Sequence, residues 1–554
     1  MNAASPTDTN QYNDITLLLR RLDSVSLRSV VGETILKAIE SSFPSNVGTE
    51  QVEILKLKYG DGILAEKQIR LAILDTLTLQ EAQTFCKAVA LPAPNHAAAC
   101  VNLQEYFDGW SEKRSREYVS FFDLSPNYQH NPLLDTRTSK QLVSAQRGAT
   151  VQLKGILHKY QQRVKDEIAS KSENIGSRFL CQMPTGSGKT YTALESVVDM
   201  FRKPEQPGKK TFAVWLVSSN ELAEQAFQEF QTLWQLKGDR EIALYRLFNH
   251  FSSDFTLEQS GVVFASFDKL HPAYTNADHS SHKSIRHLVT QSRRLIVDEA
   301  HTSVAPTHET CIRAFIKTDQ CVVMGLTATP GRNTRSENQA LTRLYSSNLV
   351  EITDDGLKPL IDPIQYLQDS QYLAELQIIE LETNISATGS EDSICKVLAA
   401  NSERNKTIIE QIKLASANKE PTLVFACTLD HVFALKILCE ASSIECRLIT
   451  GATPQVQRNT ILQSFRNQDY FILLNLDLLA TGVDLPNLQK LIITRPVGSP
   501  ILYSQILGRA LRGVLNGGRR ENTVLTLKDN LAEYPSENLV YTYFSTEWNR
   551  RRTK

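Results

Sequence analysis

The sequence predicts an α/β protein in which two parallel-sheet domains follow a mostly helical N-terminal domain. From about residue 150 onward, short apolar and β-branched runs alternate with helical patterns, as expected for parallel strands buried on both faces. These runs form two series, separated by a polar segment at residues 351–384. Before residue 150 the apolar residues recur at helical spacing instead, which predicts amphipathic helices.

The helical N-terminal domain is predicted over residues 1–148. Leu18 and Leu22 lie on one face of a predicted helix, and a later helical pattern stops before Pro92. The pattern fades between residues 123 and 147, which indicates an irregular segment or a linker.

The two α/β domains are predicted over residues 149–352 and 385–535, with a linker at 353–384 and a tail at 536–554. In the first domain the expected strands are Phe179–Met183, Phe212–Val217, Gly261–Phe264, Leu295–Val297 and Val322–Leu326. In the second domain they are Thr422–Phe425, Arg447–Ile449, Phe471–Leu474, Leu491–Thr494 and Thr523–Leu527.

The composition excludes several classes of protein. With 60 basic and 61 acidic side chains in 554 residues, the chain cannot grip nucleic acid by overall positive charge, although local basic tracks remain possible. Its nine cysteines form no CxxC pair, which argues against a zinc ribbon or a disulfide scaffold and favours buried free thiols. The polar N-terminus and the lack of a long apolar stretch predict a cytoplasmic protein with no membrane partner.

The clearest chemical signal is a glycine-rich loop between a predicted strand and a predicted helix. Glycines there allow backbone N–H groups to turn toward phosphate oxygens at the helix N-terminus. Lys189 is expected to reach the β- and γ-phosphates, and the Thr190 hydroxyl to hold Mg²⁺. Met183 stands where the generic pattern has glycine. The residues expected to contact ATP here are Pro184, Thr185, Gly186, Ser187, Gly188, Lys189 and Thr190.

Two adjacent carboxylates follow another predicted strand about 110 residues later. Asp298 and Glu299 are expected at the carboxyl edge of the sheet, where ligands of parallel sheets bind. There, Asp298 can face the metal while Glu299 faces the attacking water. The pair is a weak signal alone, but it gains weight from the phosphate loop.

Seven segments between residues 150 and 530 resemble the motif set of superfamily 2 helicases of the DEAH type. They are 157–161, 217–225, 264–270, 325–330, 423–426, 475–486 and 505–512, together with the phosphate loop and the box at 298–301. The resemblance implies two RecA-like domains that bind ATP and Mg²⁺ between them. It also implies that the segments 217–225 and 264–270 contact a nucleic-acid backbone.

The resemblance extends to individual site residues. It implies ATP contacts from Tyr160, Gln161, Gly482 and Asp484, with His158 standing where the family usually has arginine. It implies that His301, Thr327 and Thr329 couple the ATP site to nucleic acid. In the second domain Gln505, Arg509 and Arg512 fit the motif QxxGRxxR. Helical spacing would place these three side chains on one face. The resemblance implies that they are catalytic and that the two arginines reach the γ-phosphate when the two domains close.

Residues 325–332 and three further segments resemble one branch of this superfamily, the restriction helicases of bacteria and phages. The three further segments are residues 403–405, 425–431 and 512–530. That branch includes the translocating subunits of type I and type III restriction enzymes and related DNA repair helicases. The implied function is an ATP-dependent DNA translocase or helicase in repair, restriction or anti-phage defence. An RNA helicase, or an ATP-gated nucleic-acid-binding switch without processive unwinding, remains an alternative.

Residues 1–148 carry no family motif, so three interpretations stay open. They could recognise DNA, dock a partner protein or brace the fold. The basic and aromatic stretch at 110–118 suits a nucleic-acid surface, although an ordinary amphipathic helix gives the same pattern. No nuclease pattern is present, so in a restriction or defence system a nuclease or other subunit is expected as a separate chain.

Overall fold

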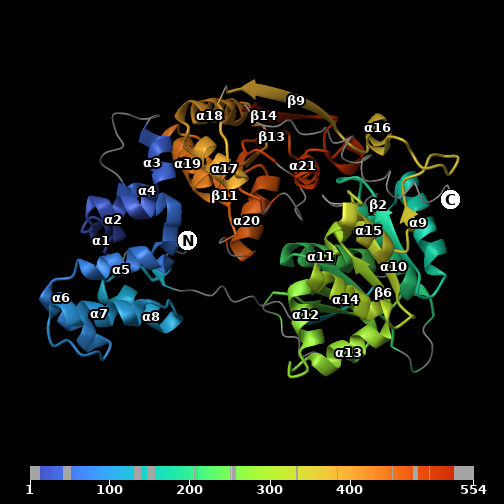
Figure 1. Ribbon diagram of the computed structural model, residues 1–554, viewed down its shortest axis with the longest axis horizontal. Coiled ribbons are helices and arrows are strands. Elements are labelled where there is room, and N and C mark those ends of the chain that lie inside the picture. Colours follow the sequence, from blue (N-terminus) through green and yellow to red (C-terminus); the bar gives the residue numbers. More distant parts are fainter. Residues whose placement is uncertain are drawn as a thin grey trace, which may run out of the picture.

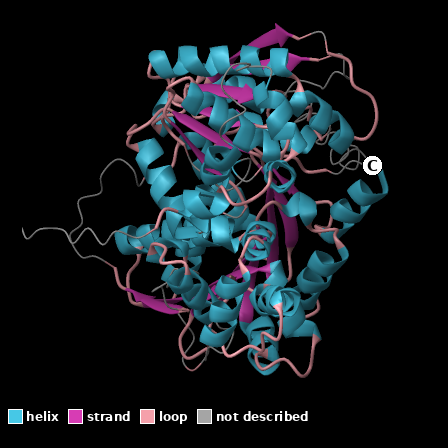
Figure 2. Cartoon of the chain, turned by 90° about the vertical axis from the view of Figure 1, so that its left-hand side faces the viewer, coloured by secondary structure: helices cyan, strands magenta, loops and turns pink. Residues whose placement is uncertain are grey.

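A computed structural model confirms the α/β class and the helical N-terminal region. Figure 2 shows helices around the strands of both sheets. The structure describes residues 13–40, 51–129, 139–145, 156–204, 208, 210–249, 251, 257–331, 335–383, 385–451, 453, 455–477, 479, 485–497 and 499–529. The predicted tail and the predicted boundaries near residues 148 and 535 lie outside these ranges.

The N-terminal domain is a cluster of short helices around its own apolar core. Its helices are α1 (Ile15–Leu19), α2 (Ser24–Val31), α3 (Glu33–Glu40), α4 (Gln51–Tyr59), α5 (Lys67–Asp75), α6 (Leu79–Ala88), α7 (His96–Phe107) and α8 (Glu112–Phe121). Helix α6 begins with a capping box, in which the Thr78 and Glu81 side chains satisfy each other's backbone N–H groups. Buried Arg70 ties α5 to the end of α7 by donating from Nε to the Phe107 carbonyl at 2.7 Å.

The first sheet has eight strands in the order β1-β4-β5-β3-β6-β7-β2-β8. Only β1 is antiparallel to its neighbour among these described strands, because it pairs with β4 in the reverse direction. The elements are β1 (Lys140–Val143), α9 (Lys159–Ser172), β2 (Arg178–Gln182), α10 (Lys189–Arg202), β3 (Phe212–Val217), α11 (Asn220–Lys237), β4 (Ile242–Leu247), β5 (Gly261–Ser266), α12 (Phe267–Thr275), α13 (His282–Gln291), β6 (Ser292–Val297), α14 (Pro306–Ile316), β7 (Val322–Thr327), α15 (Arg335–Leu344) and β8 (Leu349–Val350).

The second sheet has six parallel strands in the order β11-β12-β10-β13-β14-β9. Its elements are α16 (Pro363–Asp369), β9 (Glu375–Glu382), α17 (Glu391–Ala400), α18 (Ser402–Ala417), β10 (Thr422–Phe425), α19 (Leu429–Ala441), β11 (Cys446–Ile449), α20 (Gln455–Arg466), β12 (Ile472–Asn475), β13 (Lys490–Ile493), α21 (Pro500–Leu507) and β14 (Glu521–Lys528). Strand β9 pairs with β14 along its whole length. Much of the segment predicted as a linker, 353–384, is therefore helix and edge strand.

The N-terminal domain packs against the second α/β domain, although the first one follows it in sequence. Ala434 and Ile437 of α19 belong to the same apolar cluster as the N-terminal core. The Lys58 ammonium lies 3.7 Å from the Asp430 carboxylate of α19. In Figure 1 the blue helices α3 and α4 lie beside the orange helices α17 and α19. The helical domain and the second sheet thus form one packed unit.

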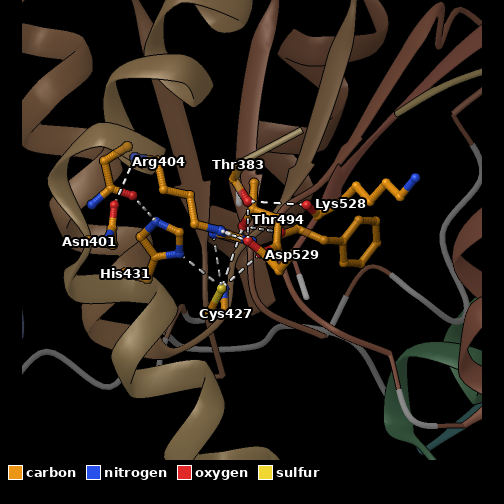
Figure 3. Close-up of polar contacts among 10 residues, drawn as sticks. Thr383, Asn401, Arg404, Cys427, His431, Thr494, Lys528 and Asp529 are labelled. Atoms are coloured by element: carbon orange, nitrogen blue, oxygen red, sulfur yellow. Dashed lines mark hydrogen bonds and ion pairs between the residues drawn. The ribbon is translucent and has the colours of Figure 1, made fainter. Parts of the chain in front are cut away.

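A buried polar network lies inside the second α/β domain, at the carboxyl edge of its sheet (Figure 3). Arg404 of α18 holds Asp529 through two hydrogen bonds, 3.0 Å from Nε to Oδ1 and 2.9 Å from Nη2 to Oδ2. It also donates to the Thr494 carbonyl, just after β13. His431 of α19 accepts from the backbone N–H of Cys427 at 3.1 Å.

All nine cysteines are buried and free, which confirms their predicted structural role. Within the described ranges, no helix is both long enough and apolar enough to cross a membrane.

Candidate ATP site

The predicted chemical residues meet at the carboxyl edge of the first sheet. The phosphate loop follows β2, the adjacent carboxylates follow β6, and Thr327 ends β7, which lies between these two strands. Parallel strands bring their carboxyl ends to one edge, so three segments distant in sequence become neighbours there.

The phosphate loop has the backbone shape that its glycines allow. Gly186 and Gly188 have φ of 81° and 80°, in the left-handed region, and Gly188 caps α10. The Ser187 hydroxyl donates to the Pro184 carbonyl at 2.7 Å and closes the turn. A Cβ at Gly188 would overlap the Gln161 amide, so a larger residue there would have to displace the Gln161 side chain from the loop. The backbone N–H groups of this loop suit an anion at the start of α10.

Tyr160 and Gln161 lie beneath this loop and support it. The Tyr160 hydroxyl donates to the Ser187 carbonyl at 2.7 Å, and the Gln161 amide donates to the same oxygen at 3.0 Å. Both side chains are buried. Gln161 also accepts from the His158 backbone N–H at 2.9 Å, closing the first turn of α9.

Sequence reasoning missed two residues beside this group. The Tyr372 ring lies 4.4 Å from the His158 ring, and the Asn516 Oδ1 lies 2.9 Å from His158 Nε2. Both lie more than 200 residues away from His158, and although Asn516 belongs to the segment 512–530, no spacing in the sequence could have placed either beside His158.

The carboxylates of the acidic box face the loop lysine. Lys189 Nζ lies 3.1 Å from Glu299 Oε1 and 3.9 Å from Asp298 Oδ1. Glu299 has a φ of 49°, a left-handed conformation that is unusual for a residue other than glycine. Such strain at the end of a strand is typical of functional sites.

Burial and neighbouring charges shift the pKa values of the two carboxylates in opposite directions. Burial raises the pKa of Asp298 to about 6, against the opposing effects of Lys189 and a hydrogen bond from Thr190. Burial also opposes ionisation of Glu299, but Lys189 and His301 outweigh it and lower the pKa of Glu299 below its usual range. Burial likewise disfavours the charged form of Lys189, yet the two carboxylates raise its pKa. Glu299 is therefore ionised at neutral pH.

A short polar chain leads away from Glu299. His301 Nδ1 lies 3.4 Å from Glu299 Oε2 and also 3.4 Å from the Thr327 hydroxyl. That hydroxyl donates to the Thr329 carbonyl at 2.9 Å and accepts from the Thr329 N–H at 3.1 Å. The three residues predicted to couple the two sites are thus consecutive members of one chain of contacts.

The second domain touches the phosphate loop near its predicted arginines. A Cβ at Gly508 would overlap the Thr185 side chain, and a Cβ at Gly186 would lie 3.6 Å from the Leu511 Cβ. Helix α21 ends at Leu507, so Arg509 and Arg512 follow the helix and do not share one helical face with Gln505. Glycine at 508 explains this end, because its backbone freedom disfavours continued helix. Gly482 and Asp484 lie outside the described residues.

Comparisons with known proteins agree with this geometry. Residues 154–332 match the family model "Type III restriction enzyme, res subunit", and residues 403–514 match "Helicase conserved C-terminal domain". The chain is a superfamily 2 helicase with restriction-helicase affinity.

Two curated relatives and one solved structure illustrate the similarity. This helicase is 25% identical to "Putative ATP-dependent helicase IRC3" of Saccharomyces cerevisiae, over 64% of the chain and 49% of the relative. It is also 25% identical to "Type I restriction enzyme EcoKI endonuclease subunit" of Escherichia coli, over 60% of the chain and 31% of the relative. The chain thus spans about half the length of the first of these relatives and about a third of the length of the second. The solved structure "DUF1998 helicase MrfA bound to DNA" has 17% identity and a TM-score of 0.47, covering 75% of this chain and 56% of that one.

The two aromatic residues of the stretch at 110–118, which was considered for nucleic-acid binding, pack inside the helical domain, while Lys113 and Arg116 are exposed. Tyr118 is fully buried, and the Trp110 ring lies 5.6 Å from it. Trp110 also faces the Arg70 guanidinium at 5.0 Å. Arg116 pairs with Glu112 one helical turn away, at 2.7 Å. The aromatic rings therefore pack in the helical domain and are not arranged as a platform for bases.

Replacing Asp298 by asparagine is expected to stabilise the nucleotide-free protein at pH 8. The folded-state pKa of about 6 lies above the ordinary value of 3.8, so this group's stabilisation is present below about pH 4 and is lost as the pH rises through 6. Two pKa units correspond to at most about 3 kcal/mol, and we expect about 1–2 kcal/mol because Lys189 loses a partner. Thermal unfolding at pH 8 and pH 5 measures the difference, which should shrink at pH 5. The matched control is Asp278→Asn in an exposed loop, and a lower melting temperature for Asp298→Asn at both pH values would refute the prediction.

Proposed function

We propose that this protein is an ATP-driven DNA translocase that hydrolyses ATP at the site between its two α/β domains. The observation that carries the proposal is the continuous set of contacts from Lys189 through Glu299 and His301 to Thr327. Lys189 is assigned to the β- and γ-phosphates, and Glu299 to the attacking water, from which it takes a proton. Its ionised state at neutral pH suits a base.

The residues present fit Mg²⁺ at this site. The Thr190 hydroxyl and the Asp298 carboxylate are hydrogen-bonded to each other, and oxygen donors of this kind are the ligands that Mg²⁺ prefers. A bound Mg²⁺ would neutralise charge on the phosphates of the substrate. It would also favour the ionised form of Asp298, because a cation close to a carboxylate lowers its pKa.

The proposed link between ATP hydrolysis and domain movement is the approach of two arginines of the second domain to the γ-phosphate. Gly508 and Leu511 already pack on the phosphate loop, and Arg509 and Arg512 directly follow them in the sequence. We assign Arg509 and Arg512 to the γ-phosphate and Gln505 to the attacking water. A small rotation of the second domain would bring the arginines closer, and such a group contributes about 10³–10⁵ in rate in related phosphoryl transfer.

The nucleic-acid path is assigned to loops on the other half of the same sheet edge. Ser219 and Ser266 are the N-cap residues of α11 and α12; Ser219 follows β3, and Ser266 is the last residue of β5. Helix N-termini with free backbone N–H groups bind phosphates without reading bases. Glu221, in the first turn of α11, pairs with Arg458 of α20, and this contact supports the proposal that both α/β domains border the path.

We assign the N-terminal helical domain to partner docking, with a nuclease or other subunit of a defence or repair system as the partner. Its packing on α19 means that it would move together with the second α/β domain. The internal packing of Trp110 and Tyr118 weighs against base stacking by this region. A domain carried on the moving half of a motor can transmit that movement to a bound partner.

The test is ATP hydrolysis by the full chain with duplex, single-stranded and forked DNA and with RNA of matched length. DNA is expected to stimulate turnover, and displacement of a triplex-forming strand is expected to accompany it. Stimulation by RNA alone would overturn the DNA assignment and favour an RNA helicase. DNA-stimulated turnover without triplex displacement would favour an ATP-gated switch instead. Lys189→Ala serves as the control for contaminating ATPases.

A further inference from the structure

A strongly basic pocket of about 600 Å³ opens on the first domain, away from the ATP site. It lies at the amino edge of the sheet, where β6 and β7 begin and α10 ends. Five cationic side chains line it against a single carboxylate: Lys165, Lys203, Arg240, Arg293 and Arg294 against Asp199. This excess is unusual in a chain whose basic and acidic residues almost cancel.

Arg294 is the feature that points to a ligand. Its side chain is buried, with the residue 7% exposed, and Nη1 donates to the Ser196 carbonyl at 3.0 Å and to its hydroxyl at 3.2 Å. Among the described residues, no atom accepts a hydrogen bond from its buried Nε. Within the part of the chain that the structure describes, no carboxylate lies within salt-bridge distance of this guanidinium. A buried charge without a counter-ion is costly, and an anion in the pocket would remove that cost.

The neighbouring cations are held in place around the pocket. Arg293 Nη1 donates to Gln320 Oε1 at 2.6 Å. The Gln320 amide is neutral, so this hydrogen bond does not compensate the positive charge of Arg293. Lys165 lies 2.9 Å from Asp199, so the one acidic residue in the lining is already paired. A ligand with more than one negative charge would therefore be favoured over a simple monoanion.

The remaining lining is mixed: Met200, Phe201 and Val322 supply apolar surface, and Ser172, Thr211 and Gln320 supply polar groups. A volume of about 600 Å³ lies in the range of small-molecule sites, about 300–1,000 Å³. Cations beside an apolar wall fit a molecule with phosphate groups at one end and an apolar or planar group at the other.

We propose that this pocket binds a phosphorylated small molecule of nucleotide size. It is distinct from the ATP site, because strand β6 carries Arg293 and Arg294 at its start and leads to Asp298 and Glu299 at its other end. Six residues of strand span about 20 Å. Helix α10 connects the same two places, since it begins at Lys189 and lines the pocket with Ser196 and Met200.

The first test uses inorganic pyrophosphate as the probe and isothermal titration calorimetry as the measurement. The full-length Lys189→Ala protein serves as the background, so that the phosphate loop contributes little. Pyrophosphate is expected to bind, and Lys203→Ala combined with Arg293→Ala is expected to weaken binding at least tenfold. The matched control is Lys283→Ala on exposed α13, which should leave binding unchanged. Absence of binding, or equal affinity in the double variant, would overturn the proposal.

A second variant separates binding from folding. Arg294→Met removes the buried charge, so its melting temperature without pyrophosphate should equal or exceed that of the background protein. The rise in melting temperature on adding pyrophosphate should disappear in the same variant. Retention of that rise would show that Arg294 does not bind the probe. Competition by an oligonucleotide but not by a nucleoside diphosphate would overturn the small-molecule assignment and indicate a nucleic-acid contact. Neither measurement depends on the proposed motor activity.

Discussion

Replacing Glu299 by glutamine is expected to lower ATP turnover by about a thousandfold while leaving nucleotide binding nearly unchanged. Glutamine keeps the shape of the side chain but cannot take a proton from water, and loss of a general base costs about 10²–10⁴ in rate. Lys189 and the phosphate loop, which are assigned to binding, stay in place. Steady-state kinetics give the turnover number, and titration with a fluorescent non-hydrolysable ATP analogue gives the affinity.

Two further variants make this result specific. Lys189→Ala should abolish turnover by weakening nucleotide binding as well, because the charge assigned to the phosphates is lost. Glu309→Gln is the matched control, since Glu309 of α14 forms an ion pair with Arg313 one helical turn away and lies outside the group of residues assigned to ATP. Turnover in Glu299→Gln close to that of Glu309→Gln would remove Glu299 from the site.

Much of the fold could be predicted because strands buried on both faces leave apolar runs in the sequence. The predicted strand Phe212–Val217 is observed with the same bounds, and every residue in it is buried. The ends of such strands also placed the phosphate loop and the acidic box at one sheet edge. The site was predictable for the same reason, because parallel topology brings those ends together.

Edge strands and interdomain contacts were not predictable in this way. Strand β9 is largely exposed, with the sequence ELQIIELE, so it leaves no buried apolar run and was assigned to a linker. The packing of the N-terminal domain on α19 depends on contacts between residues far apart in the sequence, such as Lys58 with Asp430. The basic pocket likewise combines segments that carry no common pattern.

Removing Arg404 is expected to have the largest effect on stability of any single change in the second α/β domain. Its side chain and that of Asp529 are almost completely buried, at 1% and 3% exposed. Breaking a buried ion pair from one side costs about 3–5 kcal/mol, because the remaining charge stays buried without a partner. Arg404→Ala should therefore lower the free energy of unfolding by that amount in urea titrations followed by circular dichroism. Lys396→Ala, which breaks an exposed pair with Asp392, should cost less than about 1 kcal/mol.

The network around Arg404 joins the three distant segments that resemble the restriction-helicase branch. Arg404 comes from the segment 403–405, Cys427 and His431 from 425–431, and Asp529 from 512–530. Burial and the nearby Arg404 lower the pKa of His431 to about 3, so this histidine is neutral at physiological pH and acts as a fixed hydrogen-bond partner. These residues are therefore expected to hold the second domain together, while the chemistry is assigned to the first domain and its arginine partners.

A double replacement tests this structural role. Arg404→Met together with Asp529→Leu removes both charges and fills similar volume, so most of the stability lost in Arg404→Ala should return. Because ATP chemistry is assigned elsewhere, the double variant should keep DNA-stimulated hydrolysis within a few-fold of the wild-type rate. A stable double variant that has lost hydrolysis would show that this network also positions residues of the ATP site, through Thr494 and the loop that follows β13.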